Sequence, residues 1–137
     1  MLSSLSPAVL IHLVSAVAAL VLGPLALLAR KGSRPHRDLG YAWVTLMAMA
    51  ALSSLFIRGG QLPNLAGFSP LHLLTLVTLF GLYGGLRYAM RREPGAHRWV
   101  MVSTYLGGCI VAGGFALLPD RALGQLVWGT LAVTPAP

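Results

Sequence analysis

Charged side chains are scarce in this chain of 137 residues: 9% are Asp, Glu, Lys or Arg, whereas about 25% are charged in an ordinary soluble domain. Only Asp38, Glu93 and Asp120 are carboxylates, and all three lie in predicted turns or at a predicted helix end. The chain therefore lacks the paired carboxylates of hydrolases, the buried acids of proton pumps and the oxygen ligands of divalent metal sites. An enzyme with its own acid–base residues is not expected.

Long apolar stretches take the place of these charged residues, and 56% of the chain is hydrophobic. Each stretch approaches the roughly 20 residues that a helix needs to cross a hydrocarbon core about 30 Å thick. The sequence therefore predicts an all-α integral membrane protein, a bundle of four transmembrane helices. The predicted spans cover residues of about 7–29, 39–57, 69–90 and 99–118.

The net charge of +7 is distributed unevenly along the chain. Eight basic residues surround the first and third predicted turns, whereas Arg58 and Arg121 alone lie on the opposite side. Such a bias is the positive-inside signal, not a nucleic-acid surface. It predicts a multi-pass protein of the bacterial inner membrane with both termini outside. The eight residues are Arg30, Lys31, Arg34, Arg37, Arg87, Arg91, Arg92 and Arg98.

The four histidines indicate an internal duplication. The interval from His12 to His72 is almost the same as the interval from His36 to His97. We therefore predict a single transmembrane domain, residues 1–137, built from two parallel two-helix repeats related by an axis along the membrane normal. Repeat 1 covers residues 6–58, repeat 2 covers 69–121, and residues 122–137 form a short outer helix and a tail.

In this arrangement His12 meets His72 near the outer face, and His36 meets His97 near the inner face. Two imidazoles without a cysteine or an acid do not complete a tetrahedral zinc site. They do suit the two axial positions of a haem iron, so the sequence predicts one or two b haems. Two basic residues next to the inner ligands are expected to pair with haem propionates, namely Arg37 and Arg98.

Other interpretations of the same residues stay open. Histidines near helix ends often form hydrogen bonds to neighbouring helices or to lipid headgroups, and small residues beside them often serve plain helix packing. The aromatic residues Tyr41, Trp43 and Trp99 are expected to anchor helices at the membrane interface. The single Cys109 excludes an intramolecular disulfide and is expected to be a small buried residue.

Three strings of the chain resemble an uncharacterised family of small bacterial four-helix membrane proteins. They are I-H-L-V-S-A-V-A-A-L-V-L-G-P-L-A-L-L, P-H-R-D-L-G-Y-A-W-V and A-H-R-W-V-M-V-S-T-Y, and the resemblance covers most of residues 10–118. The layout is also similar to that of the four-helix diheme cytochromes b. That similarity implies ligation by the first histidine with the third and by the second with the fourth.

The function predicted from the sequence is a membrane-embedded b-type cytochrome that passes electrons to or from a quinone, another cytochrome or a partner oxidoreductase. An accessory, non-catalytic subunit of a larger membrane complex is the alternative. A small carrier is the third possibility, although the middle of the membrane contains no charge at which a carrier would bind its substrate.

Overall fold

The structure is a computed structural model that describes residues 5–57 and 70–131, and every regular element in these ranges is a helix. Arg58, Ser69 and the tail 132–137 lie outside the described residues. In chain order the elements are α1 (Pro7–Leu28), α2 (Arg34–Ser54), α3 (Pro70–Met90), α4 (Pro94–Tyr105), the π-helical segment η2 (Leu106–Val111), α5 (Ala112–Ala116) and α6 (Ala122–Leu131).

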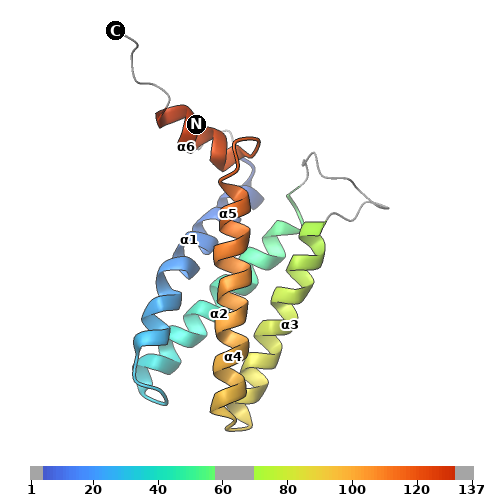
Figure 1. The fold of residues 1–137 in the computed structure, drawn as a ribbon. Coiled ribbons are helices and arrows are strands. Elements are labelled where there is room, and N and C mark those ends of the chain that lie inside the picture. The colour runs from blue at the N-terminus through green and yellow to red at the C-terminus, as the bar shows by residue number, and fades with distance from the viewer. Residues whose placement is uncertain (1–4, 58–69, 132–137) are drawn as a thin grey trace.

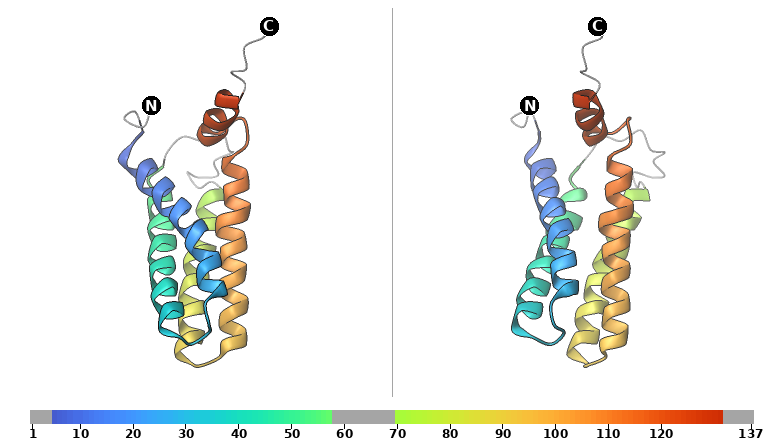
Figure 2. Two further views of the ribbon diagram at one scale, coloured as in Figure 1. Left: turned by 90° about the vertical axis from the view of Figure 1, so that its left-hand side faces the viewer. Right: turned by 60° about the vertical axis from the view of Figure 1, so that its left-hand side comes forward.

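Two helical hairpins make up the bundle (Figure 1). Helix α1 packs along α2, and α3 packs along the rod formed by α4, η2 and α5, while contacts of α2 with α3 and of η2 with α1 join the two hairpins. Both short turns lie at the same end, and α6 lies at the opposite end, as both views of Figure 2 show. Helices α1 and α3 therefore run in one direction, and α2 and α4 run in the other.

Helices α2 and α4 begin earlier than the apolar stretches predicted, at Arg34 and Pro94 instead of near 39 and 99. Proline in the first turn of each helix fixes the backbone in a helical φ, and Ser33 caps α2 by accepting the backbone N–H of His36 at 3.3 Å. The two inner histidines therefore belong to the first turns of helices, and not to the connecting loops.

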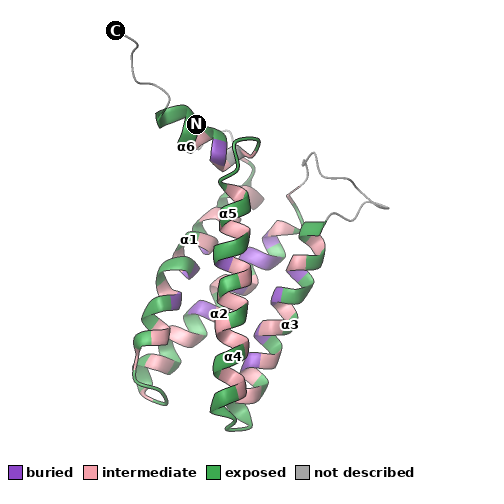
Figure 3. Ribbon diagram, in the orientation of Figure 1, coloured by how far each residue is buried: buried purple, intermediate pink, exposed green. Residues whose placement is uncertain are grey.

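Within residues 5–57 and 70–131, three helices are long and apolar enough to cross a membrane: Pro7–Leu28, Pro70–Met90 and Pro94–Ala116. Helix α2 has a similar length but is less apolar, since its first turns contain two arginines and an aspartate. Exposed apolar residues such as Val14, Leu73 and Phe80 cover the outside of the bundle, and buried positions face inward (Figure 3). A monomer in water rarely exposes so much contiguous apolar surface, so the outer face suits lipid.

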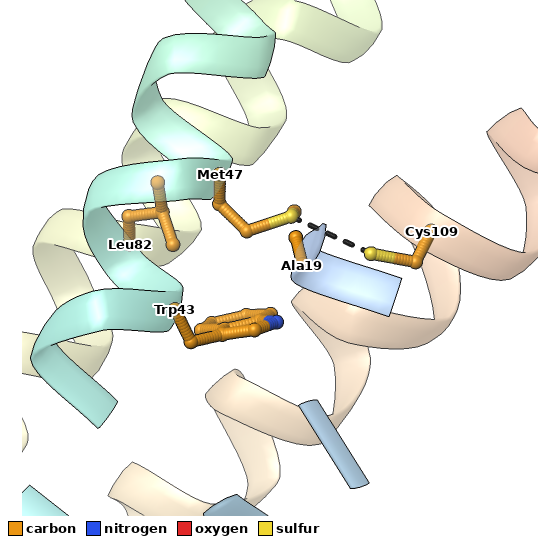
Figure 4. Packing of buried hydrophobic residues seen from close by; sticks show 5 residues of the cluster. All are labelled: Ala19, Trp43, Met47, Leu82 and Cys109. Carbon is orange, nitrogen blue, oxygen red and sulfur yellow. Dashed lines mark hydrogen bonds between the residues drawn. The ribbon is translucent and has the colours of Figure 1, made fainter. Parts of the chain in front are cut away.

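The buried core lies in the middle of the bundle, where all four long helical rods meet. Trp43 and Met47 of α2 are its largest members, and the Cys109 thiol lies 3.5 Å from the Met47 sulfur (Figure 4). Cys109 is thus a small buried residue, as expected. Trp43, however, is only 5% exposed, so its predicted place at the membrane interface is wrong. The complete cluster is Ala19, Trp43, Met47, Leu82 and Cys109.

Hydrogen bonds also join the two hairpins. The Ser54 and Thr75 hydroxyl oxygens lie 2.8 Å apart between α2 and α3, and the Tyr105 hydroxyl donates to the backbone carbonyl of Leu20 at 3.1 Å. That carbonyl is available because Pro24, four residues later in α1, has no N–H to donate to it. These bonds fix how the two halves of the candidate site lie against each other.

Candidate functional site

The inner pair of histidines is oriented by the backbone of the facing helices. Nδ1 of His36 lies 2.9 Å from the Ala26 carbonyl oxygen of α1, and Nδ1 of His97 lies 2.8 Å from the Gly85 carbonyl oxygen of α3. A carbonyl oxygen only accepts hydrogen bonds, so Nδ1 of each ring must hold the proton. Both neutral imidazoles then keep their lone pair on Nε2. A metal-binding histidine has this arrangement, its second nitrogen bonded to a carbonyl or carboxylate.

The predicted pairing of His36 with His97 is matched by their positions. The two ring centroids lie 6.4 Å apart and the ring planes are inclined by 85°. An imidazole nitrogen lies about 2.0 Å from a first-row metal and the ring centre about 1.1 Å farther on, so two imidazoles that held one iron between them would have centroids about 6.2 Å apart.

The surroundings of this pair differ between the two hairpins. Gly40 follows His36 by one helical turn, and a Cβ built on it would meet no atom within 4 Å. In the second hairpin, four residues after His97, Met101 packs so closely on Gly85 that a Cβ added to Gly85 would lie 2.5 Å from the Met101 methyl carbon. Open space therefore adjoins Gly40 of the first hairpin, whereas Met101 fills the space beside Gly85 in the second.

A bare metal ion would need more ligands than this site supplies. Among residues 5–57 and 70–131, no group of three or more His, Cys, Asp or Glu side chains is placed to hold one. A haem brings four nitrogens of its own and needs only two axial ligands from the protein. The chemistry of the donor set therefore fits haem better than zinc or another free cation.

The outer histidines lie near the opposite end of the bundle. Nδ1 of His12 bonds to the Ala50 carbonyl oxygen of α2 at 2.8 Å, and the Ser53 hydroxyl oxygen lies 3.5 Å from the same nitrogen. His72 lies one helical turn before Thr75, which is buried in the bundle. His12 therefore has the same tautomer and free Nε2 as the inner histidines, while its pairing with His72 stays a prediction.

Helix α1 and helix α2 contribute equally to both layers. The interval from His12 to Ala26 on α1 equals the interval from His36 to Ala50 on α2, and each corresponds to about four helical turns. Each helix thus contributes an imidazole to one layer and, about 21 Å farther along its axis, a carbonyl acceptor to the other layer. The His12–Ala50 and His36–Ala26 bonds are thus reciprocal. The distance between the two layers is most of the thickness of a hydrocarbon core.

The two arginines predicted to assist lie next to the inner ligands and are exposed. The Arg37 guanidinium donates to the Gly32 carbonyl at 3.3 Å, and Arg98 is exposed on the first turn of α4. Both are long enough to reach a carboxylate at the membrane surface, but their pairing with propionates stays a prediction.

Sequence reasoning identified the histidines but missed their partners, the carbonyls of Ala26, Ala50 and Gly85. A backbone carbonyl gives no signal in the sequence, so no pattern could have pointed to these acceptors. The Tyr105–Leu20 bond did have a signal, because Pro24 inside an apolar stretch leaves the carbonyl four residues earlier without its helical donor. The indole N–H of Trp43 is buried and has no acceptor among the described residues. No signal in the sequence pointed to this.

Comparison with known proteins agrees with the helical, apolar character of the chain. No curated protein and no solved structure matches it. The model of a family described as a predicted membrane protein, DUF2306, matches residues 9–113, a range that includes all four histidines. The chain therefore belongs to this family of predicted membrane proteins.

Proposed function

We propose that the protein is a membrane-embedded b-type cytochrome that holds a haem between His36 and His97 and transfers electrons. The observation that supports this proposal most is the inner pair: two imidazoles 6.4 Å apart, each with Nδ1 bonded to a backbone carbonyl. This spacing suits axial ligands on opposite faces of one iron, and the carbonyl bonds leave both Nε2 atoms free to coordinate it.

A haem with two histidine ligands supplies one-electron chemistry and leaves no coordination position for oxygen. The chain's own residues hold and orient this group. The carbonyls of Ala26 and Gly85 fix the tautomer and direction of the two rings, and the open space beside Gly40 leaves room next to His36. Arg37 and Arg98 neutralise propionates at the membrane surface.

The outer pair, His12 and His72, is proposed as a second haem site on the basis of the repeat. His12 has the same Nδ1–carbonyl bond as the inner histidines. A second site about 21 Å along the helices would let electrons cross the membrane instead of moving along one surface. Quinones, other cytochromes and membrane oxidoreductases are the proposed redox partners.

Haem content tests this proposal directly. We expect the full-length protein, purified in mild detergent after expression with added haem, to show the sharp reduced bands of six-coordinate b haem and up to two haems per chain by pyridine haemochrome assay. His36→Ala and His97→Ala should each remove the same haem, so the double variant should lose no more than either single variant. His12→Ala should remove the other one. Tyr41→Phe, an exposed position on α2, is the matched control.

A colourless protein under these conditions would contradict the proposal, and so would haem that survives His36→Ala and His97→Ala together. In that event the alternative, an accessory subunit of a larger membrane complex, predicts that the chain purifies with partner proteins in the same mild detergent. The exposed apolar faces of α1 and α3 would then contact those partners.

A further inference from the structure

Eight exposed cations gather at one end of the bundle. They come from both hairpins, since the turn between α1 and α2 and the turn between α3 and α4 lie side by side at this end (Figure 2). The inner histidines lie in the same helical turns as several of them, and Arg37 and Arg98 directly follow the two ligands. We call this group the cationic cap, formed by Arg30, Lys31, Arg34, Arg37, Arg87, Arg91, Arg92 and Arg98.

The opposite end of the bundle has no comparable charge. Its described charged residues are Asp120 and Arg121, which offset each other, and the sequence adds only Arg58. Within the cationic cap, Asp38 and Glu93 offset two of the eight cations. The side chain that lies 3.5 Å from Nδ1 of the outer histidine His12 is the hydroxyl of Ser53, not a charged group.

Helix dipoles do not cancel this difference. Each end of the bundle contains the N-termini of two long helical rods and the C-termini of the other two. The partial charges of the four rods therefore nearly balance at both ends. The side chains of the cationic cap remain the main electrostatic difference between the inner and the outer histidine layer.

We propose that the cationic cap raises the reduction potential of the haem at His36 and His97 above that of the outer site, so that the inner layer is the electron-accepting end of the bundle. This inference rests on the proposed function. Ferric haem with two neutral imidazoles has one more positive charge at its centre than ferrous haem, so nearby cations destabilise the oxidised form. With haem held in both layers, one electron would pass from the outer to the inner layer, so that the outer haem is oxidised as the inner haem is reduced.

The cations closest to His36 and His97 should have the largest effect on the reduction potential. Solvent screens exposed charges beyond a Debye length of about 8–10 Å at physiological salt. Arg37 and Arg98 adjoin the ligands in sequence and lie in the same helical turns, so they should contribute more than the cations at the far side of the turns. Screening also means that the effect weakens as the ionic strength rises.

An equilibrium redox titration of the full-length protein in lipid nanodiscs, followed by the reduced haem band, tests this inference. His12→Ala isolates the inner haem, and in this background Arg37→Gln with Arg98→Gln should shift its midpoint to lower potential. Arg37→Lys with Arg98→Lys should keep the midpoint, because the charges remain. Arg121→Gln, at the other end of the bundle, should leave it unchanged. Added salt should lower the midpoint of the parent more than that of the Gln variant, which keeps the other cations of the cap.

The outcomes separate this inference from the proposed function. A protein without haem would overturn both. Haem that is bound with an unchanged midpoint in the Arg37→Gln, Arg98→Gln variant would overturn the inference alone, and so would equal midpoints for the inner and outer haems of the parent protein. A lower midpoint in the Lys variant as well would overturn it too, because side-chain geometry, not charge, would then set the potential.

Discussion

Tyr105 shows at the scale of one residue how a proline in a membrane helix is compensated from another helix. Pro24 leaves the Leu20 carbonyl without its helical donor, and the Tyr105 hydroxyl replaces that donor at 3.1 Å. The Tyr105 ring also packs on α1, since a Cβ on Gly23 would collide with it. The Tyr105 side chain therefore supplies the hydrogen bond that the α1 backbone lacks, and it links α1 to α4.

A double-mutant cycle tests this coupling. Tyr105→Phe should destabilise the protein by about 0.6 kcal/mol and by no more than about 1.7 kcal/mol, the average and the maximum measured for hydrogen bonds between membrane helices. In a Pro24→Ala background the same change should cost less, because the N–H of residue 24 then bonds to the Leu20 carbonyl. Unfolding in mixed detergent micelles measures both values, with Tyr41→Phe as the control for loss of an exposed phenol. Equal costs in the two backgrounds would refute the coupling.

The turn between α3 and α4 contains a strained residue where a glycine is usual. The Glu93 N–H donates to the Tyr88 carbonyl and the Arg92 N–H to the Ala89 carbonyl, which are the two bonds of a Schellman motif. Arg92 takes the left-handed position of this motif with a φ of 56°, whereas the left-handed residue in the turn between α1 and α2 is Gly32, with a φ of 77°. Glycine adopts this conformation without strain.

Arg92→Gly should therefore stabilise the second hairpin by about 1 kcal/mol, since a left-handed conformation costs an L-residue roughly that much. Arg92→Ala removes the same charge but keeps the strain, so it should not stabilise the protein. Thermal unfolding in detergent compares the two variants. If both raise the unfolding temperature equally, the relief of charge repulsion, and not of the backbone, is the cause.

At the scale of the element, the π-helical segment η2 lies where the sequence offset of the predicted repeat changes. The offset between equivalent residues is larger for the pair Arg58 and Arg121 than for the pair His36 and His97. A π-helical turn takes up an additional residue without ending the helix, and η2 lies within this interval. The sequence offsets indicated that residues had been gained, but they did not reveal that the helix would absorb one as a π-turn at Gly107 and Gly108.

The number of membrane crossings is a property of the whole molecule, and it decides on which sides the two turns lie. If α2 crosses the membrane, as the sequence predicts, the turns at Lys31 and Gly95 lie on the same side. If α2 does not cross, they lie on opposite sides. In a Cys109→Ser background, we expect Lys31→Cys and Gly95→Cys to resist a membrane-impermeant maleimide on intact cells, whereas Gln125→Cys on α6 should react.

Labelling of only one of the two turns would show that α2 does not cross. Labelling of both turns with protection of Gln125→Cys would show that the orientation is reversed. Permeabilised cells, in which all three positions should react, control for local accessibility, since Lys31, Gly95 and Gln125 are all exposed.

Much of the fold followed from the sequence because apolar length and turn chemistry are local properties. The beginnings of α2 and α4 were missed, since a search for apolar residues ignores a polar first turn that Ser33 and the prolines hold in helical form. The inner pair His36–His97 was predicted from the repeat alone. The burial of Trp43 was not, because interface anchors and core residues share the same composition and differ only in how the hairpins rotate against each other.

The carbonyl bonds to the inner histidines have a consequence for biosynthesis. The His36–Ala26 bond is complete within the first hairpin, and the His97–Gly85 bond is complete within the second. Each half of the site can therefore form as its own hairpin enters the membrane during translation, before the other half exists. In the proposed cytochrome, haem would bind last and would link two hairpins that had entered the membrane independently.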